Sequence, residues 1–116
     1  MSNWHEQPEL KGLKLFGQQA AAAGGRLDLL AHDLEGKSLV VIELKRGHVG
    51  GEVVEQIERY LGSPEVRRLA GKSAVRGVAI ARGYLPGARH AARRSPYLIE
   101  LWTFSGDRDQ LRLHRQ

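Results

Sequence analysis

Two apolar runs separated by a glycine turn constrain the fold of this chain more than any other feature. Arg26 to Asp33 alternates in a way that gives a strand one apolar face, Glu35-Gly36 supplies a turn, and Ser38 to Arg46 is rich in Val and Ile. A period of two and β-branched residues are typical of strands, and a short turn between two such runs is typical of a hairpin. The sequence therefore predicts an antiparallel hairpin over residues 26–46.

The length of the turn decides which residues face each other. If the turn is a two-residue loop, Asp28 lies directly opposite Glu43, and Lys45 lies on the same face. Cross-strand partners hold their Cβ atoms about 4.5 to 5.5 Å apart, which is close enough for two carboxylates to share one cation. The opposite face of the hairpin is then apolar and consists of Leu27, Leu29, Ala31, Val40, Ile42 and Leu44.

The remainder of the chain predicts a single mixed α/β domain over residues 1–116. Val53, Val54, Ile57, Tyr60 and Leu61 fall on one helical stripe, and Ser63 followed by Pro64 is typical of a new helix start. Gly47 to Gly51 is expected to be a flexible connection. The further expected elements are a strand over Val75–Arg82, a basic helix over Pro86–Arg94, a strand over Tyr97–Phe104 and an edge strand over Leu111–His114.

Composition narrows the classes of function. The 18 Lys and Arg against 13 Asp and Glu give a net charge of +5, which favours polyanionic partners. The chain has no cysteine, so disulfide frameworks, zinc ribbons and thiol catalysis are excluded. Its apolar stretches are too short to cross a bilayer, and Met1 to Gly12 lacks the apolar core of a signal peptide, so a soluble protein compatible with the cytoplasm is expected.

Asp28, Glu43 and Lys45 are the candidate catalytic residues. Two facing carboxylates repel each other unless a cation or a nearby positive charge compensates them. Mg²⁺ prefers oxygen ligands and keeps several waters, so two carboxylates and a substrate phosphate are an ordinary site for it. Lys45 could then orient the attacking water or stabilise charge on the phosphate. The alternative is that both acids are solvent-facing strand residues in surface ion pairs with Arg26 and Lys45.

Several motifs resemble those of a known enzyme family. The run Gly25-Arg26-Leu27-Asp28 is followed by Val40-Val41-Ile42-Glu43-Leu44-Lys45, which carries an E-X-K signature, and then by Gln56-Ile57-Glu58-Arg59-Tyr60, which matches a Q-x-x-x-Y motif. In this order, the motifs resemble the PD-(D/E)XK nuclease superfamily with its RecB-like members, and closely the nuclease domain of NucS/EndoMS-type endonucleases. The likeness covers most of the chain, from about Pro8 to Phe104.

The resemblance implies a restriction-endonuclease-like mixed central sheet flanked by helices, and an Mg²⁺-dependent deoxyribonuclease that hydrolyses phosphodiester bonds. It implies Mg²⁺, or alternatively Mn²⁺, held by Asp28, Glu43 and the backbone carbonyl of Leu44, with Lys45 assisting the attacking water. Gln56 and Tyr60 would line the site; independently, they lie four residues apart on one helix face. The expected partner is DNA, single- or double-stranded, with no membrane partner, and a homodimer is left open.

Basic side chains offer contacts to phosphate groups. Arg26 and Arg46 flank the acidic pair in sequence, and Arg89, Arg93 and Arg94 gather on the basic helix. Such contacts give salt-dependent affinity without sequence readout, although a solvated basic face is the plainer interpretation for each residue alone.

The chain also departs from the family pattern. The family often has a further Glu on a helix upstream of the Asp, and the candidates for that place here are Glu6 and Glu9. A non-catalytic nucleic-acid-binding module on a nuclease fold, or the nuclease domain of a toxin effector, therefore stays open as an alternative.

Overall fold

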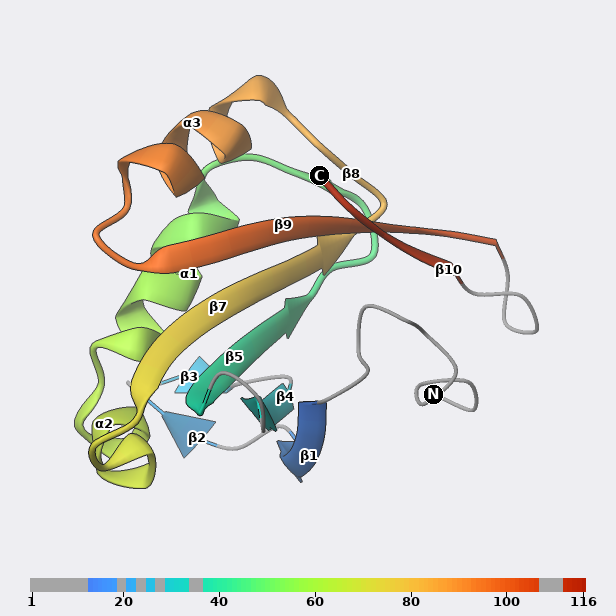
Figure 1. The fold of residues 1–116 in the computed structure, drawn as a ribbon. Helices are drawn as coiled ribbons and strands as arrows, with labels where there is room; N and C mark the ends of the chain where they lie inside the picture. The colour runs from blue at the N-terminus through green and yellow to red at the C-terminus, as the bar shows by residue number, and fades with distance from the viewer. Residues whose placement is uncertain (1–12, 19–20, 23–24, 27–28, 34–36, 107–111) are drawn as a thin grey trace.

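The computed structural model describes residues 13–18, 21–22, 25–26, 29–33, 37–106 and 112–116. Within these residues, strands and helices alternate along the chain (Figure 1). In order, the elements are β1 (Leu13–Gln18), β2 (Ala21–Ala22), β3 (Gly25–Arg26), β4 (Leu29–Asp33), β5 (Ser38–Leu44), β6 (His48–Val49), α1 (Glu52–Leu61), α2 (Pro64–Ala70), β7 (Ala74–Ala81), β8 (Gly83–Tyr84), α3 (Pro86–Arg94), β9 (Leu98–Ser105) and β10 (Arg112–Arg115).

A mixed sheet organises the described part of the molecule. Its strand order is β1-β4-β5-β7-β9-β10, with β5, β7 and β9 parallel to one another and the outer strands antiparallel to their neighbours. Helices connect the parallel strands, as a parallel pair requires a long crossover. The prediction of a mixed α/β fold is confirmed, and so is the prediction that the last strand lies at an edge.

The predicted hairpin is present with the predicted register. Leu29 lies opposite Ile42, and Asp33 lies opposite Ser38. This is the pairing that a two-residue loop at positions 35–36 requires, so the register is confirmed over these residues. Asp28 and residues 34–36 lie outside the described residues, and the pairing of Asp28 with Glu43 stays a prediction.

Both faces of β5 are buried. Leu39 and Val41 pack with the helices, whereas Val40 and Ile42 pack with Trp102 in a second cluster on the opposite face. Strands that are covered on both sides read as continuous apolar runs, which explains the sequence of β5. The predicted apolar face is confirmed for Ala31, Val40 and Ile42, and Leu44 packs against the same cluster.

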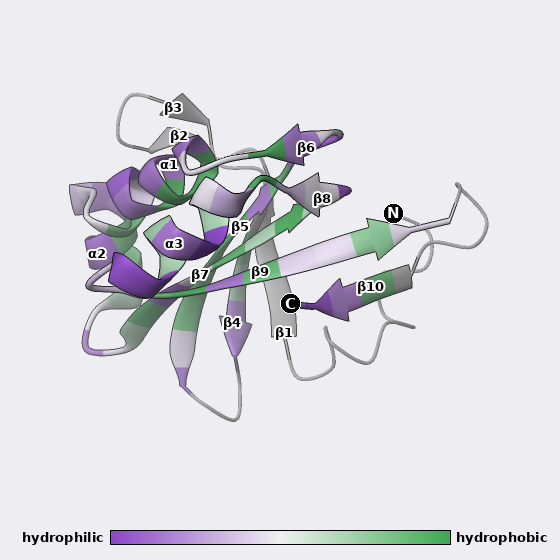
Figure 2. Cartoon of the chain, turned by 90° about the horizontal axis from the view of Figure 1, so that it is seen from above, coloured by the Kyte–Doolittle hydropathy of each residue, from purple (hydrophilic) through white to green (hydrophobic). Residues whose placement is uncertain are grey.

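The three helices cover one face of the sheet, and their ends follow local sequence signals. The Ser63 hydroxyl accepts a hydrogen bond from the Val66 N–H at 3.3 Å, so Ser63 is the predicted N-cap of α2. The bounds of α3 agree with the prediction, and Figure 2 shows it as largely hydrophilic. No helix among the described residues has the length and apolarity needed to span a membrane.

The segment Gly47–Gly51 is better ordered than the sequence suggests, and its prediction as a flexible connection is wrong in part. His48 and Val49 form β6, which pairs in parallel with β8 at Gly83 and Tyr84. Each of these strands has only two residues, which is too few to show a periodicity in the sequence.

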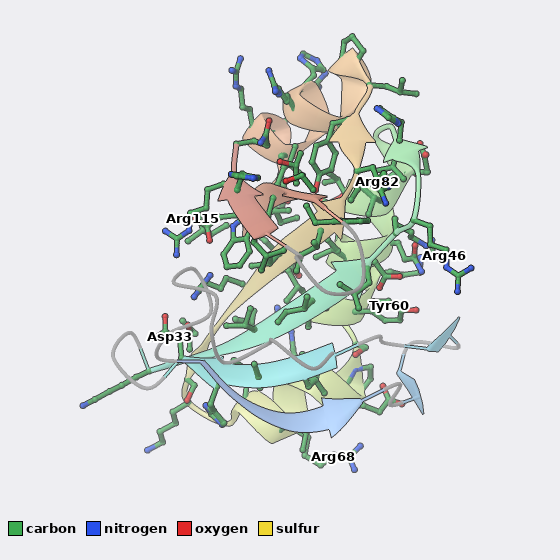
Figure 3. All side chains as sticks on the ribbon, turned by 90° about the vertical axis from the view of Figure 1, so that its right-hand side faces the viewer. Asp33, Arg46, Tyr60, Arg68, Arg82 and Arg115 are labelled. Atoms are coloured by element: carbon green, nitrogen blue, oxygen red, sulfur yellow. The ribbon has the colours of Figure 1, made fainter. Side chains whose placement is uncertain are left out.

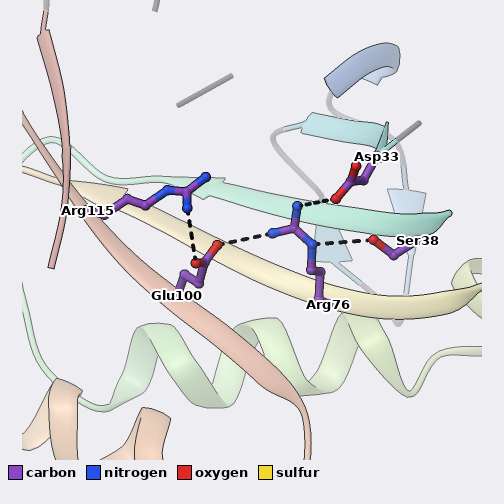
Figure 4. A network of polar contacts seen from close by, with 5 residues as sticks. All are labelled: Asp33, Ser38, Arg76, Glu100 and Arg115. Atoms are coloured by element: carbon purple, nitrogen blue, oxygen red, sulfur yellow. Dashed lines mark hydrogen bonds and ion pairs between the residues drawn. The ribbon is translucent and has the colours of Figure 1, made fainter. Parts of the chain in front are cut away.

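A polar network crosses the sheet on the face opposite the helices (Figure 4). Arg76 of β7 donates to Asp33 at 2.9 Å, to Glu100 at 3.1 Å and to the Ser38 hydroxyl at 3.3 Å. Arg115 lies 3.9 Å from the other oxygen of Glu100. Side chains from β4, β5, β7, β9 and β10 are thereby connected at the margin of the second apolar cluster.

Candidate active site

Glu43 lies near the carboxyl end of β5, on the face that the helices cover. Its residue is only 2% exposed, and its register partner on β7 is Ala79. Charged side chains are almost never this buried unless they are paired. The alternative reading of Glu43 as a solvent-facing strand residue is therefore wrong, because the helical layer encloses this face.

Lys45 is the cation beside Glu43. Its Nζ lies 3.4 Å from Glu43 Oε1, and the exposed fractions of the two side chains are 35% for Lys45 and 3% for Glu43. The backbone N–H of Lys45 donates to the Ile80 carbonyl at 2.9 Å, which extends the β5–β7 pairing by one residue beyond the strand. Lys45 thus connects a buried carboxylate with solvent at the point where β5 ends.

Glu52, the first residue of α1, is a further acidic group at this end of the sheet. Its carboxylate accepts a hydrogen bond from the Gly50 N–H at 3.0 Å. That hydrogen bond above all, and also the charge of Lys45, lower the pKa of Glu52. Glu52 belongs to none of the sequence motifs that predicted the site; an acidic residue in the first turn of a helix was the available signal.

Gln56 and Tyr60 lie on α1, which covers the face that carries Glu43. Gln56 Nε2 lies 3.5 Å from the Tyr60 hydroxyl, a long hydrogen bond between residues one helical turn apart. Tyr60 is buried within the first apolar cluster and Gln56 is half-buried. Tyr60 is therefore a core aromatic whose hydroxyl contacts the Gln56 amide at the edge of the core.

Two arginines follow the ends of the central strands. Arg46 is exposed after β5, and Arg82 is exposed after β7, where its guanidinium stacks 4.9 Å from the centroid of the Phe104 ring. Figure 3 shows Arg46, Arg82 and Tyr60 on one side of the molecule and Arg115 on the other. Arg46 was a predicted phosphate contact, whereas Arg82 was predicted only as the last residue of a strand.

The basic residues of α3 belong to a different surface. Arg89 donates to the side chain of Gln116 at 3.0 Å, and Arg93 lines a groove beside β9. Arg94 is exposed and lies 3.4 Å from His90 Nε2. Arg26 contributes backbone to β3, but its side chain lies outside what the structure describes.

The expected metal ligands lie partly among the described residues. Among the residues that the structure describes, no three His, Cys, Asp or Glu side chains cluster as a metal site. Of the expected ligands, Glu43 and Leu44 are described, whereas Asp28, Glu6 and Glu9 are not. A buried carboxylate at a strand end supplies the hard oxygen donor that Mg²⁺ and Mn²⁺ take, so the described ligands fit such an ion.

One family model matches most of the chain, and several solved structures share its fold. The family model described as "Endonuclease NucS C-terminal domain" matches residues 4–105. A repair endonuclease from Pyrococcus abyssi superposes with a TM-score of 0.68 at 24% identity, over 86% of this chain. An EndoMS–dsDNA complex gives 0.66 at 27% identity, over 86% of this chain, and EndoMS in its apo form gives 0.60 at 28% identity, over 80%. A comparison with curated proteins gave no match.

The chain spans about two-fifths of the length of these three proteins: it covers 42%, 41% and 40% of their respective chains.

Proposed function

The chain belongs to the family of endonuclease NucS C-terminal domains, and from this premise we propose that it is a metal-dependent endonuclease domain that hydrolyses DNA phosphodiester bonds. The related structures include one in complex with double-stranded DNA. Their identity of 27–28% accompanies a shared fold over 80–86% of this chain.

The observation that carries this proposal is the pairing of Glu43 with Lys45. A carboxylate at 2% exposure is costly to bury, and a structural salt bridge alone is a weak reason to keep it. Here the partner ammonium is partly exposed at the end of a central strand, and the next residue, Arg46, is exposed. A functional role explains why this polar pair occupies an otherwise apolar layer.

In the proposed mechanism, the described residues act from their observed positions, and Asp28 acts from its predicted place opposite Glu43. Glu43, together with Asp28 and the Leu44 carbonyl, would hold Mg²⁺ or Mn²⁺, which when bound supplies Lewis-acid stabilisation of the phosphate charge. Lys45 would orient the attacking water and stabilise developing negative charge. Gln56 and Tyr60 would line the site from α1.

The exposed arginines would position the nucleic acid. Arg46 directly follows Lys45 and is exposed, so it can contact a phosphate that flanks the cleaved bond; Arg82 lies at the same end of the sheet but stacks on Phe104 of the second apolar cluster. Such contacts determine affinity and its dependence on salt without reading sequence.

Cleavage assays test the proposal. Plasmid, single-stranded DNA and RNA are incubated with Mg²⁺ or Mn²⁺ and with EDTA, and wild type is compared with Glu43→Gln and Lys45→Met. We expect metal-dependent DNA cleavage that falls by at least about a hundredfold in both variants, the order of effect of removing one transition-state contact. Arg68→Ala is the matched control, because Arg68 is exposed on α2 at a distance from this site.

Two outcomes would contradict the proposal. Cleavage that survives EDTA or the Glu43→Gln substitution would refute the assigned site. Binding of DNA without cleavage would instead support the non-catalytic module.

A further inference from the structure

The chain segments that follow β5 and β7 stay side by side beyond the ends of these two strands. The Arg82 N–H donates to the Gly47 carbonyl at 3.2 Å, and β6 then pairs in parallel with β8, with His48 opposite Gly83. The backbone of His48 is therefore held by pairing with a neighbouring segment at the end of the sheet where β5 and β7 finish.

The side chain of His48 points away from the first apolar cluster. Successive side chains of a strand point to opposite sides, and the next residue, Val49, packs against that cluster, as does its register partner Tyr84. His48 is exposed, and it forms no hydrogen bond or ion pair with the residues that the structure describes. The imidazole therefore presents polar ring atoms to solvent.

Gly83 leaves room for this ring. A Cβ on Gly83 would lie 2.5 Å from His48 Cδ2 and 2.6 Å from His48 Nε2, which is below the 3.0 Å that real Cβ atoms keep. Gly83 is not among the glycines with a positive φ, so the ring and not the backbone conformation requires a glycine here. Packing on Gly83 holds an exposed ring in one orientation, and a pre-ordered side chain loses less entropy when it contacts a ligand.

The surroundings of His48 are mostly cationic. Arg46 and Arg82 are exposed, and among the described residues neither has a carboxylate within ion-pair distance. Lys45 precedes His48 by three residues, so their Cα atoms are at most about 11 Å apart. One DNA strand carries a phosphate about every 3.4 Å of helix axis, so this span corresponds to about three nucleotides. Glu52, the nearest acid along the chain, accepts a hydrogen bond from a backbone N–H.

We propose that the His48 imidazole binds DNA by donating a hydrogen bond to a phosphate oxygen within about three nucleotides of the bond at the Glu43–Lys45 site. The inference rests on the proposed function, because it takes the anion to be DNA bound at that site. A phosphate oxygen accepts hydrogen bonds from fixed donors whatever the base sequence. A metal ion is the poorer ligand for this imidazole, because the neighbouring cations repel it.

Fluorescence anisotropy with a short labelled DNA duplex in EDTA measures this contact without metal-dependent hydrolysis. We expect His48→Ala to bind about tenfold more weakly, the effect of losing one hydrogen bond to a charged group. His48→Lys keeps a donor and should stay within about threefold of wild type. Arg68→Ala, on α2, is the control for the loss of a cation elsewhere and should leave affinity unchanged.

Gly83→Ala tests whether the orientation of the ring matters. The added methyl group displaces the ring, so this variant should lose about as much affinity as His48→Ala. The double variant should lose no more affinity than either single variant, because both changes remove the same contact. The double variant has no ring to clash with the methyl group, so its melting temperature should be close to that of wild type.

Four results would overturn the proposal: unchanged affinity in His48→Ala, His48→Lys as weak as His48→Ala, additive losses in the double variant, or no binding of the duplex by wild type. Cleavage in Mg²⁺ is measured separately on the same proteins. Binding that depends on His48 without any hydrolysis would contradict the proposed nuclease activity but not this contact, whereas hydrolysis with unchanged affinity in His48→Ala would contradict only the contact.

Discussion

Gly77 is the position where the packing of α1 on the sheet leaves no room for a side chain. A Cβ at this position would lie 2.3 Å from Ile57 Cγ2, whereas ordinary van der Waals contact begins at 3.4 Å. Ile99 and Leu61 atoms follow at 3.6 Å, so the methyl group has no alternative space. In Gly77→Ala, α1 must therefore move away from β7 by roughly 1 Å, which is the kind of overpacking that costs about 1–3 kcal/mol.

The net change in the free energy of unfolding of Gly77→Ala is the difference between a gain in the unfolded state and a clash cost in the folded state. Replacing a strand glycine with alanine gains about 0.4–1 kcal/mol from the lower entropy of the unfolded chain. Because the overlap with Ile57 exceeds 1 Å, a clash cost near the upper limit should dominate, and we expect a net loss of about 2 kcal/mol. For a domain of this size, that corresponds to a melting temperature lower by about 8 °C.

Thermal and urea unfolding, monitored by circular dichroism, measure this loss. Gly47→Ala is the matched control, because a Cβ there meets nothing within 4 Å. Ile57→Leu removes the methyl branch at Cβ and should relieve the clash, so the double variant should be about 1 kcal/mol more stable than the sum of the single effects predicts. A Gly77→Ala variant as stable as wild type, or strictly additive effects, would refute the close packing of α1 on β7.

Three smaller predictions concern Lys45, the helix cap Ser63 and Glu52. Lys45→Met should lower the free energy of unfolding in urea by about 1–2 kcal/mol, which is less than for a fully buried pair because Lys45 is partly exposed. This loss should be smaller when Glu43→Gln is also present. A loss of the same size in the double variant would contradict the pairing of Lys45 with Glu43. Ser63→Ala should cost about 1–2 kcal/mol, since the hydroxyl caps α2 and is buried; an unchanged melting temperature would argue against the cap. Glu52 has a pKa lowered below 4.5, so it contributes stability above that value and loses it as pH falls through the lowered pKa. The melting temperature of Glu52→Gln should therefore lie below wild type at neutral pH and converge with it in acid, whereas a pH-independent difference would contradict this assignment.

Local patterns allowed much of the fold to be predicted from the sequence. The register of β4 and β5 follows from the alternation of two runs and the length of one turn, and α3 begins and ends at Pro86 and Arg94 as its flanking residues indicate. In contrast, β6 and β8 form by pairing across a long separation in sequence, and two residues are too few to show a period.

The environment of the candidate site was harder to predict than its motif. The E-X-K spacing identified Glu43 and Lys45, but the burial of Glu43 depends on α1 lying over β5, which no local pattern specifies. Likewise, Glu52 approaches Lys45 only because β5 and α1 meet at the same end of the sheet. The partners of Arg76 on three other strands depend on the order of strands in the sheet, which periodicity alone does not determine.

The most direct measurement of the central proposal is the location of a bound metal ion, independent of catalysis. Mn²⁺ broadens nearby resonances, so titration of the isotopically labelled protein reports which backbone amides lie close to the ion. We predict that the amides of Glu43, Leu44 and Lys45 broaden first and that this selective broadening disappears in Glu43→Gln. Broadening that is uniform, centred elsewhere, or unchanged in Glu43→Gln would contradict a metal-dependent nuclease site at the end of β5.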